Sequence, residues 1–145
     1  MKSKIQTREP RYCFQCDDGT VLVRATRDVT NDIEGELFVV KRISGWHCPV
    51  CGEVEFAQDD DSAERYSLAL EAATTRANER KAQQLRSTRK KLKLTQAEAG
   101  CLFGGGMSAF SEYERGKTQP HKSTVLLLRL LDRHPELLNE LMHTA

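Results

Sequence analysis

Residues 103–120 read FGGGMSAFSEYERGKTQP, with three consecutive glycines followed by a segment of aromatic and charged side chains. Upstream, Thr95 and Glu98 have the spacing of a capping box, which predicts a short helix running to about Phe103. Downstream, Phe110 and Tyr113 lie three residues apart, on one face of a second helix. Glycines supply the positive φ angles of a sharp corner. The stretch therefore predicts a helix-turn-helix, with a plain helical hairpin as the alternative.

Further helices are expected on both sides of this unit. Asp61 and Glu64 resemble a helix start, the polar run 72–78 (AATTRAN) predicts a break, and residues 76–92 predict a basic helix. Gly100 inside the short helix predicts close contact with a neighbouring helix, because glycine costs about 1 kcal/mol in a helix. We place a domain boundary at about residue 75.

Two helices are predicted after the glycine corner. Ser123 is expected to cap the first, and Pro135 is expected to start the second. The first carries more apolar side chains than a single helix needs, the second adds three leucines, and this surplus indicates a homodimer interface. The residues concerned are Val125, Leu126, Leu128, Leu130, Leu131, Leu137, Leu138 and Leu141.

Charge is distributed unevenly along the 145 residues. Residues 1–75 carry 9 basic and 14 acidic side chains, whereas residues 76–117 carry 10 basic and 4 acidic ones. Such asymmetry favours a nucleic-acid partner for the basic segment, and a solvated basic helix face is the alternative. The chain has no apolar run of the roughly 20 residues that span a bilayer and no secretory signal, so we expect a cytoplasmic protein without membrane contact.

Four cysteines form two CxxC pairs, Cys13 with Cys16 and Cys48 with Cys51. In the cytoplasm disulfides are rare, and two such pairs supply the four thiolates of a tetrahedral zinc site. Strands over residues 20–28 and 36–43, joined by a turn over residues 31–35, would bring the pairs together as a hairpin. A hairpin is marginally stable alone, so we expect structural Zn(II) to supply folding free energy.

Other roles for these cysteines were weighed against structural zinc. Catalytic zinc keeps an open coordination position, which four cysteines would fill, and a redox dithiol is typical of a single CxxC in a βαβ setting. His47 could replace one thiolate but is expected to be a hydrogen-bonding neighbour. Iron would also suit four thiolates. Cys101, far from both pairs, is expected to be chemically silent, with redox sensing as the alternative.

The stretch LTQAEAGCLFGGGMSAFSEYERGKTQP resembles the helix-turn-helix of the Xre and Cro repressors, and the resemblance continues through STVLLLRLLDRHPELLNEL. The triple glycine, the YERGKTQPH turn and the RLLDRHPELL ending are similar to the MqsA antitoxins. Those proteins also carry an N-terminal four-cysteine zinc domain with its cysteine pairs in the same order. The resemblance is strong over residues 92–141 and rests on the cysteine pairs in the first half, while residues 1–11 extend beyond the usual start of the family.

The resemblance implies an antitoxin that is not an enzyme. A zinc domain over residues 1–75 would neutralise a ribonuclease-like toxin. A five-helix, Xre/Cro-like domain over residues 76–145 would dimerise and repress its own operon by binding a palindromic double-stranded operator. The expected fold class is α+β. A free-standing zinc-containing transcriptional repressor that senses metal or recruits another protein is the alternative, and a zinc nuclease is disfavoured by the four thiolates.

The resemblance also places a recognition helix at residues 107–115. Ser108 and Glu112 would face base edges, where MqsA carries asparagine and arginine, so the operator sequence is left open. A glutamate can accept a hydrogen bond from cytosine, but Glu112 could instead pair with Arg115. Met107 is expected to contact a thymine methyl group or to be partly buried. The expected phosphate contacts are Gln96, Ser111 and Lys117.

Overall fold

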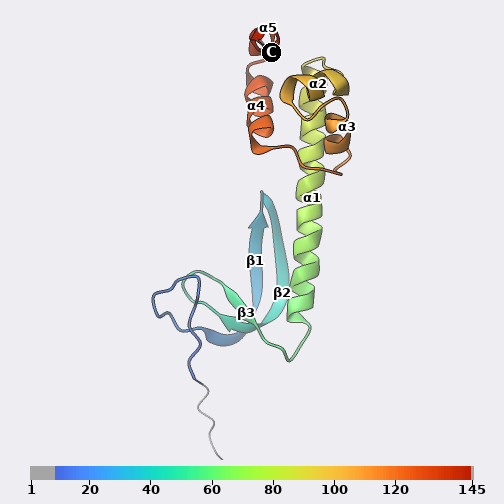
Figure 1. The fold of residues 1–145 in the computed structure, drawn as a ribbon. Helices are drawn as coiled ribbons and strands as arrows, with labels where there is room; N and C mark the ends of the chain where they lie inside the picture. The colour runs from blue at the N-terminus through green and yellow to red at the C-terminus, as the bar shows by residue number, and fades with distance from the viewer. Residues whose placement is uncertain (1–8, 145) are drawn as a thin grey trace, which may run out of the picture. The chain divides into compact units, whose positions relative to one another are not determined.

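The structure is a computed structural model that describes residues 9–144. These residues form an α+β fold with one small sheet and five helices, so the predicted fold class is confirmed (Figure 1). Its elements are β1 (Val23–Ile33), β2 (Glu36–His47), β3 (Val54–Phe56), α1 (Ser62–Lys91), α2 (Gln96–Phe103), α3 (Ala109–Glu114), α4 (Lys122–Arg133) and α5 (Leu137–Thr144). Among the described residues, no helix combines the length and apolar character needed to cross a membrane.

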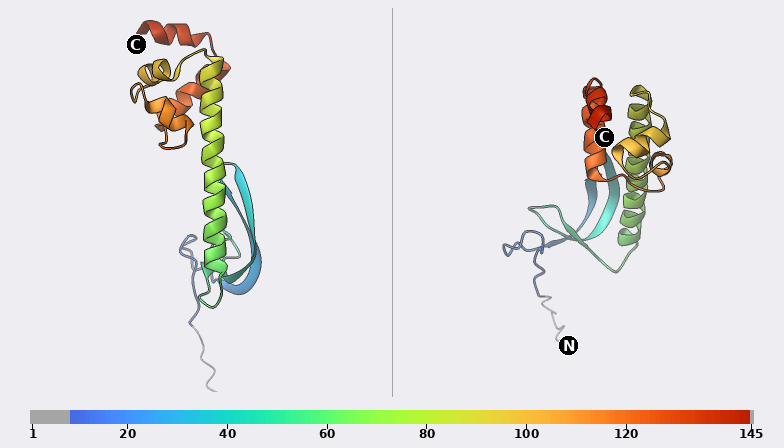
Figure 2. Two further views of the ribbon diagram at one scale, coloured as in Figure 1. Left: turned by 90° about the vertical axis from the view of Figure 1, so that its right-hand side faces the viewer. Right: turned by 45° about the horizontal axis from the view of Figure 1, so that its top comes forward.

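The chain divides into two compact units, Met1–Thr74 and Thr75–Ala145, and α1 contributes residues to both. The break predicted over residues 72–78 is wrong, because α1 continues through this stretch without interruption (Figure 2). Its small side chains explain the continuity. Ala73 and Ala77 are fully buried, and alanine is the best helix former, so a polar-looking run can be both helical and packed.

In the first unit, β1, β2 and β3 form an antiparallel sheet in that order. The strand expected at 20–28 began three residues too early and ended five too early, the strand expected at 36–43 ended four residues too early, and β3 was missed. The turn between β1 and β2 contains only Glu34 and Gly35, both with positive φ, as a tight type I′ hairpin requires. Residues 31–33, expected in the turn, belong to β1. A β-bulge lies between Arg27 and Val29.

The start of α1 packs on this hairpin. Phe38, Val40, Ile43 and Ala73 form its buried apolar cluster. The fully buried Ser62 links helix to sheet, because its Oγ accepts a hydrogen bond from the Ser44 N–H at 2.9 Å. Asp60 caps the helix by accepting bonds from the Ser62 N–H and hydroxyl, each at 2.9 Å. Asp61 holds the predicted N-cap position, where its carbonyl accepts from the Arg65 N–H at 2.9 Å, but its carboxylate pairs with the Arg65 side chain instead of bonding the first turn.

In the second unit, the remainder of α1 and helices α2–α5 surround a core centred on Phe110 and Leu131, which are 0% and 1% exposed. The capping box of α2 is confirmed, because the Thr95 hydroxyl accepts from the Glu98 N–H while Glu98 accepts from the Thr95 N–H. The cap predicted for α4 and the start predicted for α5 were both wrong. His121 caps α4 in place of Ser123, and α5 begins at Leu137, two residues after Pro135.

The glycine corner between α2 and α3 has the backbone that its sequence predicts. Gly104, Gly105 and Gly106 have φ angles of 90°, 94° and 84°, which side-chain-bearing residues rarely adopt. Gly100 also serves this corner. A Cβ at Gly100 would lie 2.0 Å from the Gly106 carbonyl oxygen, so the close contact predicted for Gly100 is with the corner and not with another helix.

Candidate functional site

The two cysteine pairs meet in the first unit. The sulfur atoms of Cys13, Cys16, Cys48 and Cys51 all lie within 4.8 Å of one another, and we call them the four-cysteine cluster. Cys13 Sγ lies 3.5 Å from Cys51 Sγ, and Cys16 Sγ lies 3.7 Å from Cys48 Sγ. A tetrahedral ion with Zn–S bonds of about 2.3 Å would space its sulfur ligands by about 3.8 Å. The arrangement therefore fits a four-coordinate metal ion.

Backbone groups around the cluster favour thiolate ligands. The N–H groups of Cys51 and Val50 point to Cys48 Sγ at 3.5 and 3.4 Å, and these bonds, led by that from Cys51, lower the pKa of Cys48 to about 6. The pKa of Cys16 is raised, first by its hydrogen bond with Cys51 and then by burial. A divalent ion would displace this proton, because thiolates are the metal-binding form.

His47 lies beside the cluster but outside it. Its ring Nε2 lies 3.1 Å from the Ile43 carbonyl oxygen, and the side chain is only 4% exposed. This agrees with the expected role of a hydrogen-bonding neighbour. Cys101 is an exposed free thiol on α2.

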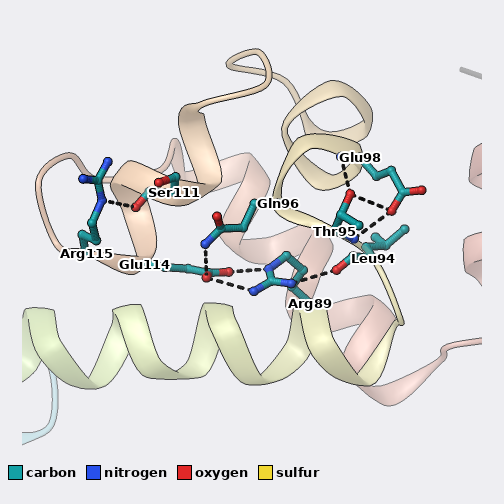
Figure 3. Close-up of polar contacts among 8 residues, drawn as sticks. All are labelled: Arg89, Leu94, Thr95, Gln96, Glu98, Ser111, Glu114 and Arg115. Atoms are coloured by element: carbon teal, nitrogen blue, oxygen red, sulfur yellow. Dashed lines mark hydrogen bonds and ion pairs between the residues drawn. The ribbon is translucent and has the colours of Figure 1, made fainter.

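The second candidate site is built around α3. Its inner face is fixed by a buried ion pair, because Arg89 of α1 donates to both carboxylate oxygens of Glu114, at 2.5 and 3.0 Å (Figure 3). The side chains are only 10% and 4% exposed. Gln96 of α2 adds a bond to Glu114 at 2.7 Å, and Arg89 also donates to the Leu94 carbonyl at 2.8 Å. We call Arg89, Gln96 and Glu114 the Glu114 network.

The electrostatics of this network follow from its geometry. Burial works against ionisation of Glu114, but hydrogen bonds from Arg89 and Gln96 outweigh it and lower the pKa of the carboxyl group. The carboxylate in turn raises the pKa of Arg89. The network therefore holds α1, α2 and α3 together through one charged carboxylate. The sequence analysis did not identify Arg89 and Glu114 as partners. Their opposite charges were the only available signal, and the two residues lie 25 positions apart in the chain.

The other predicted contact residues lie around the start and outer side of α3. Met107 is 70% exposed, so the partly buried alternative is wrong. Ser108 and Lys117 are exposed, whereas Ser111 and Glu112 are half-buried. The pairing of Glu112 with Arg115 is not found in residues 9–144, where Arg115 Nε instead donates to the Ser111 carbonyl at 3.0 Å (Figure 3). Gln96 differs from this group, because its amide nitrogen is committed to Glu114.

Comparison with known proteins extends across both units. The family model described as the antitoxin component of bacterial toxin-antitoxin systems, MqsA, matches residues 11–142. The chain is also 40% identical over 129 residues to Antitoxin MqsA of Escherichia coli (strain K12), an alignment that covers 89% of this chain and 98% of that protein. The matched range, residues 11–142, spans the positions of the four-cysteine cluster and of the Glu114 network.

Proposed function

Because the chain belongs to the MqsA family of antitoxins, we propose that residues 1–75 neutralise a ribonuclease-like toxin and that residues 76–145 bind operator DNA as a repressor of the same operon. The observation that carries this proposal is the family match across residues 11–142, which spans both units. The proposal assigns no catalytic role to the protein.

The surface of the first unit supports a protein partner there. Phe14, Leu37 and Val50 are 96%, 66% and 70% exposed. Phe14 and Val50 lie inside the two CxxC pairs, so their exposed side chains offer apolar contacts to a partner beside the four-cysteine cluster. The acidic excess of residues 1–75 suits a basic partner, as an RNA-cleaving toxin is expected to be.

We assign structural Zn(II) to the four-cysteine cluster. Four thiolates complete its tetrahedral coordination and leave no position for a reacting water, so the ion would contribute folding free energy and not chemistry. The β1–β2 sheet buries few large apolar residues, which makes this contribution important for the first unit.

In the second unit, α2, the glycine corner and α3 would act as a helix-turn-helix. Ser108 and Glu112 would face base edges in the major groove, and Met107 would contact a thymine methyl group. Ser111 and Lys117 would contact phosphates, and Gln96 would do so from the start of α2 while its amide nitrogen holds Glu114. The Glu114 network would keep α3 in place as it enters the groove.

Dimerisation would place two copies of α3, one from each chain, on the two halves of a palindromic operator. Leu126 and Leu130 on α4 and Met142 on α5 are 52%, 39% and 55% exposed, which supports an apolar contact with a second copy. A symmetric dimer would read half-sites separated by about one helical turn of DNA.

Co-expression tests the antitoxin function. The reading frame next to the gene for this protein, which is expected to encode the toxin, is expressed alone and together with the full chain. Growth of the cells and co-purification of the two proteins are then measured. Arrested growth that is rescued by a stable complex is the expected result. Absence of both toxicity and complex would overturn it in favour of a free-standing zinc-containing transcriptional repressor.

Base readout is tested separately with binding-site selection on full-length variants. Ser108→Ala and Glu112→Ala are expected to change the preferred sequence while leaving the zinc content intact. Lys117→Ala is the matched control, because loss of a phosphate contact should weaken binding to all sequences alike. It should also reduce the slope of log binding constant against log salt concentration by about 1. A uniform loss on every sequence for all three variants would contradict base readout by Ser108 and Glu112.

A further inference from the structure

Trp46, the only tryptophan of the chain, is covered by an arginine from a distant segment. The guanidinium carbon of Arg11 lies 3.9 Å from the ring centroid of Trp46, and the same guanidinium pairs with Glu55. Trp46 and Glu55 are register partners on β2 and β3. We call Arg11, Trp46 and Glu55 the tryptophan clamp.

The clamp joins the segments that carry the two cysteine pairs. Arg11 lies two residues before Cys13, whereas Trp46 lies two residues before Cys48 and Glu55 lies four residues after Cys51. The strands carrying Trp46 and Glu55 therefore enter and leave the second pair, and Arg11 leads directly into the first.

Backbone hydrogen bonds make the arm between Arg11 and the first pair short and fixed. The Arg11 carbonyl accepts from the Leu22 N–H at 2.8 Å, and the Cys13 N–H donates to the Thr20 carbonyl at 2.8 Å. Leu22 and Cys13 in turn pack with Cys48 in a small buried cluster, against which Trp46 also packs. Contacts that hold the Arg11 side chain on Trp46 and Glu55 therefore also restrict the position of Cys13.

We infer that the tryptophan clamp preorganises the four-cysteine cluster and thereby sets its affinity for zinc. Without the clamp, the packing of Cys13, Leu22 and Cys48 remains, and ion binding must supply the rest of the free energy that orders the two pairs. An arrangement already held in the metal-free protein removes part of that cost. The inference rests on the proposed metal site, and it assigns Arg11, Trp46 and Glu55 as positioning residues that do not touch the ion.

The chain contains a matched control for this effect. Arg24 also lies over Trp46, with its guanidinium carbon 4.9 Å from the ring centroid, and it pairs with Asp59 at 2.9 Å. Arg24 is the register partner of Trp46 in the β1–β2 hairpin, and its side chain also donates to Ser44 Oγ at 2.8 Å. These contacts join strands that the sheet already pairs, whereas Arg11 reaches Trp46 from the segment before the first cysteine pair. Removal of Arg24 should disturb the same indole without releasing the first pair.

The test measures zinc affinity of the full-length protein by competition with a chromophoric chelator. Arg11→Met is expected to weaken zinc binding about tenfold, from the combined loss of a cation–π contact and an ion pair. Arg11→Lys should retain part of the affinity, Glu55→Gln should weaken binding less than Arg11→Met, and Arg24→Met should stay within twofold of wild type. Far-UV circular dichroism of each zinc-loaded variant checks that it is folded.

Cobalt substitution supplies a second measurement. The visible spectrum of bound Co(II) should remain that of a tetrahedral thiolate site in Arg11→Met, because the ligands are unchanged. Unaltered zinc affinity in Arg11→Met, or equal losses in Arg11→Met and Arg24→Met, would overturn the inference. Failure of the wild-type protein to bind zinc would instead overturn the metal site itself.

Discussion

Replacing Glu114 by glutamine is expected to destabilise the second unit strongly, although the side chain keeps its size. The substitution leaves the guanidinium of Arg89 buried, at 10% exposure, without its carboxylate partner. Removing one member of a buried ion pair typically costs about 3–5 kcal/mol, and because the amide oxygen of glutamine still accepts a hydrogen bond, we expect a loss of about 3 kcal/mol.

The second unit also contains an exposed ion pair for comparison. Lys91 Nζ lies 2.9 Å from Asp132 Oδ1, but these side chains are 52% and 46% exposed. Solvent screens such a pair, so Asp132→Asn should cost less than about 1 kcal/mol. The two substitutions make the same chemical change, from carboxylate to amide, and differ mainly in burial.

Urea denaturation of the zinc-loaded protein at pH 7, followed by circular dichroism at 222 nm, measures both losses. With a urea dependence of about 1.5 kcal/mol/M, Glu114→Gln should lower the midpoint by about 2 M and Asp132→Asn by less than about 0.7 M. Equal shifts would refute the reasoning. Combining Glu114→Leu with Arg89→Met should recover much of the stability, because no charge is then left buried without a partner.

The pH dependence provides an independent check of the same ion pair. The folded-state pKa of Glu114 is lowered, so its contribution to stability is present above the unfolded-state value of about 4.3 and is lost as the pH falls through the folded value. The difference between wild type and Glu114→Gln should therefore narrow in acid. A difference that stays constant from pH 7 to pH 2 would contradict the assigned cause.

Three further predictions concern the glycine corner, a helix cap and the metal. Gly100→Ala should lower the melting temperature, because its Cβ would lie 2.0 Å from the Gly106 carbonyl oxygen and overpacking costs about 1–3 kcal/mol; a raised melting temperature would count against that contact. Thr95→Ala should cost about 1 kcal/mol in urea denaturation by removing the capping box shared with Glu98, and an unchanged midpoint would argue that the cap is unimportant. Chelation of the metal should collapse the amide NMR signals of the sheet while those of α2–α5 persist, and a sheet spectrum that survives chelation would contradict a structural ion.

Local sequence patterns were sufficient to predict several parts of the fold. The Thr95 capping box and the glycine corner depend on residues close together in the chain, and both were confirmed. The meeting of the two cysteine pairs in one cluster was predictable as well, because each CxxC motif places two sulfur atoms where they can bind the same ion. Caps, turns and metal-ligand motifs that depend on local spacing can therefore be predicted from a single sequence.

Features set by tertiary packing were not predictable in the same way. The run 72–78 lacks large apolar residues and was expected to break the helix, yet Ala73 is buried because the sheet approaches α1 closely. The Glu114 network joins Arg89 to a carboxylate 25 positions away, with no periodic signal. The side-chain bonds to the start of α1 come from Asp60 and not from Asp61, because Arg65 bonds the Asp61 carboxylate together with the backbone carbonyls of Lys41 and Arg42.

The two sides of α3 differ in how freely their residues can be exchanged. Glu114 is tied to helices on both sides, so a change there requires compensating changes at Arg89 and Gln96. Ser108 is exposed, and no side-chain partner holds it or Glu112 within the described residues. The outward positions can therefore diverge one substitution at a time at little cost to folding. Under the proposed operator-binding function, duplicated copies of this chain could acquire separate DNA targets by such steps and cease to regulate one another's operons.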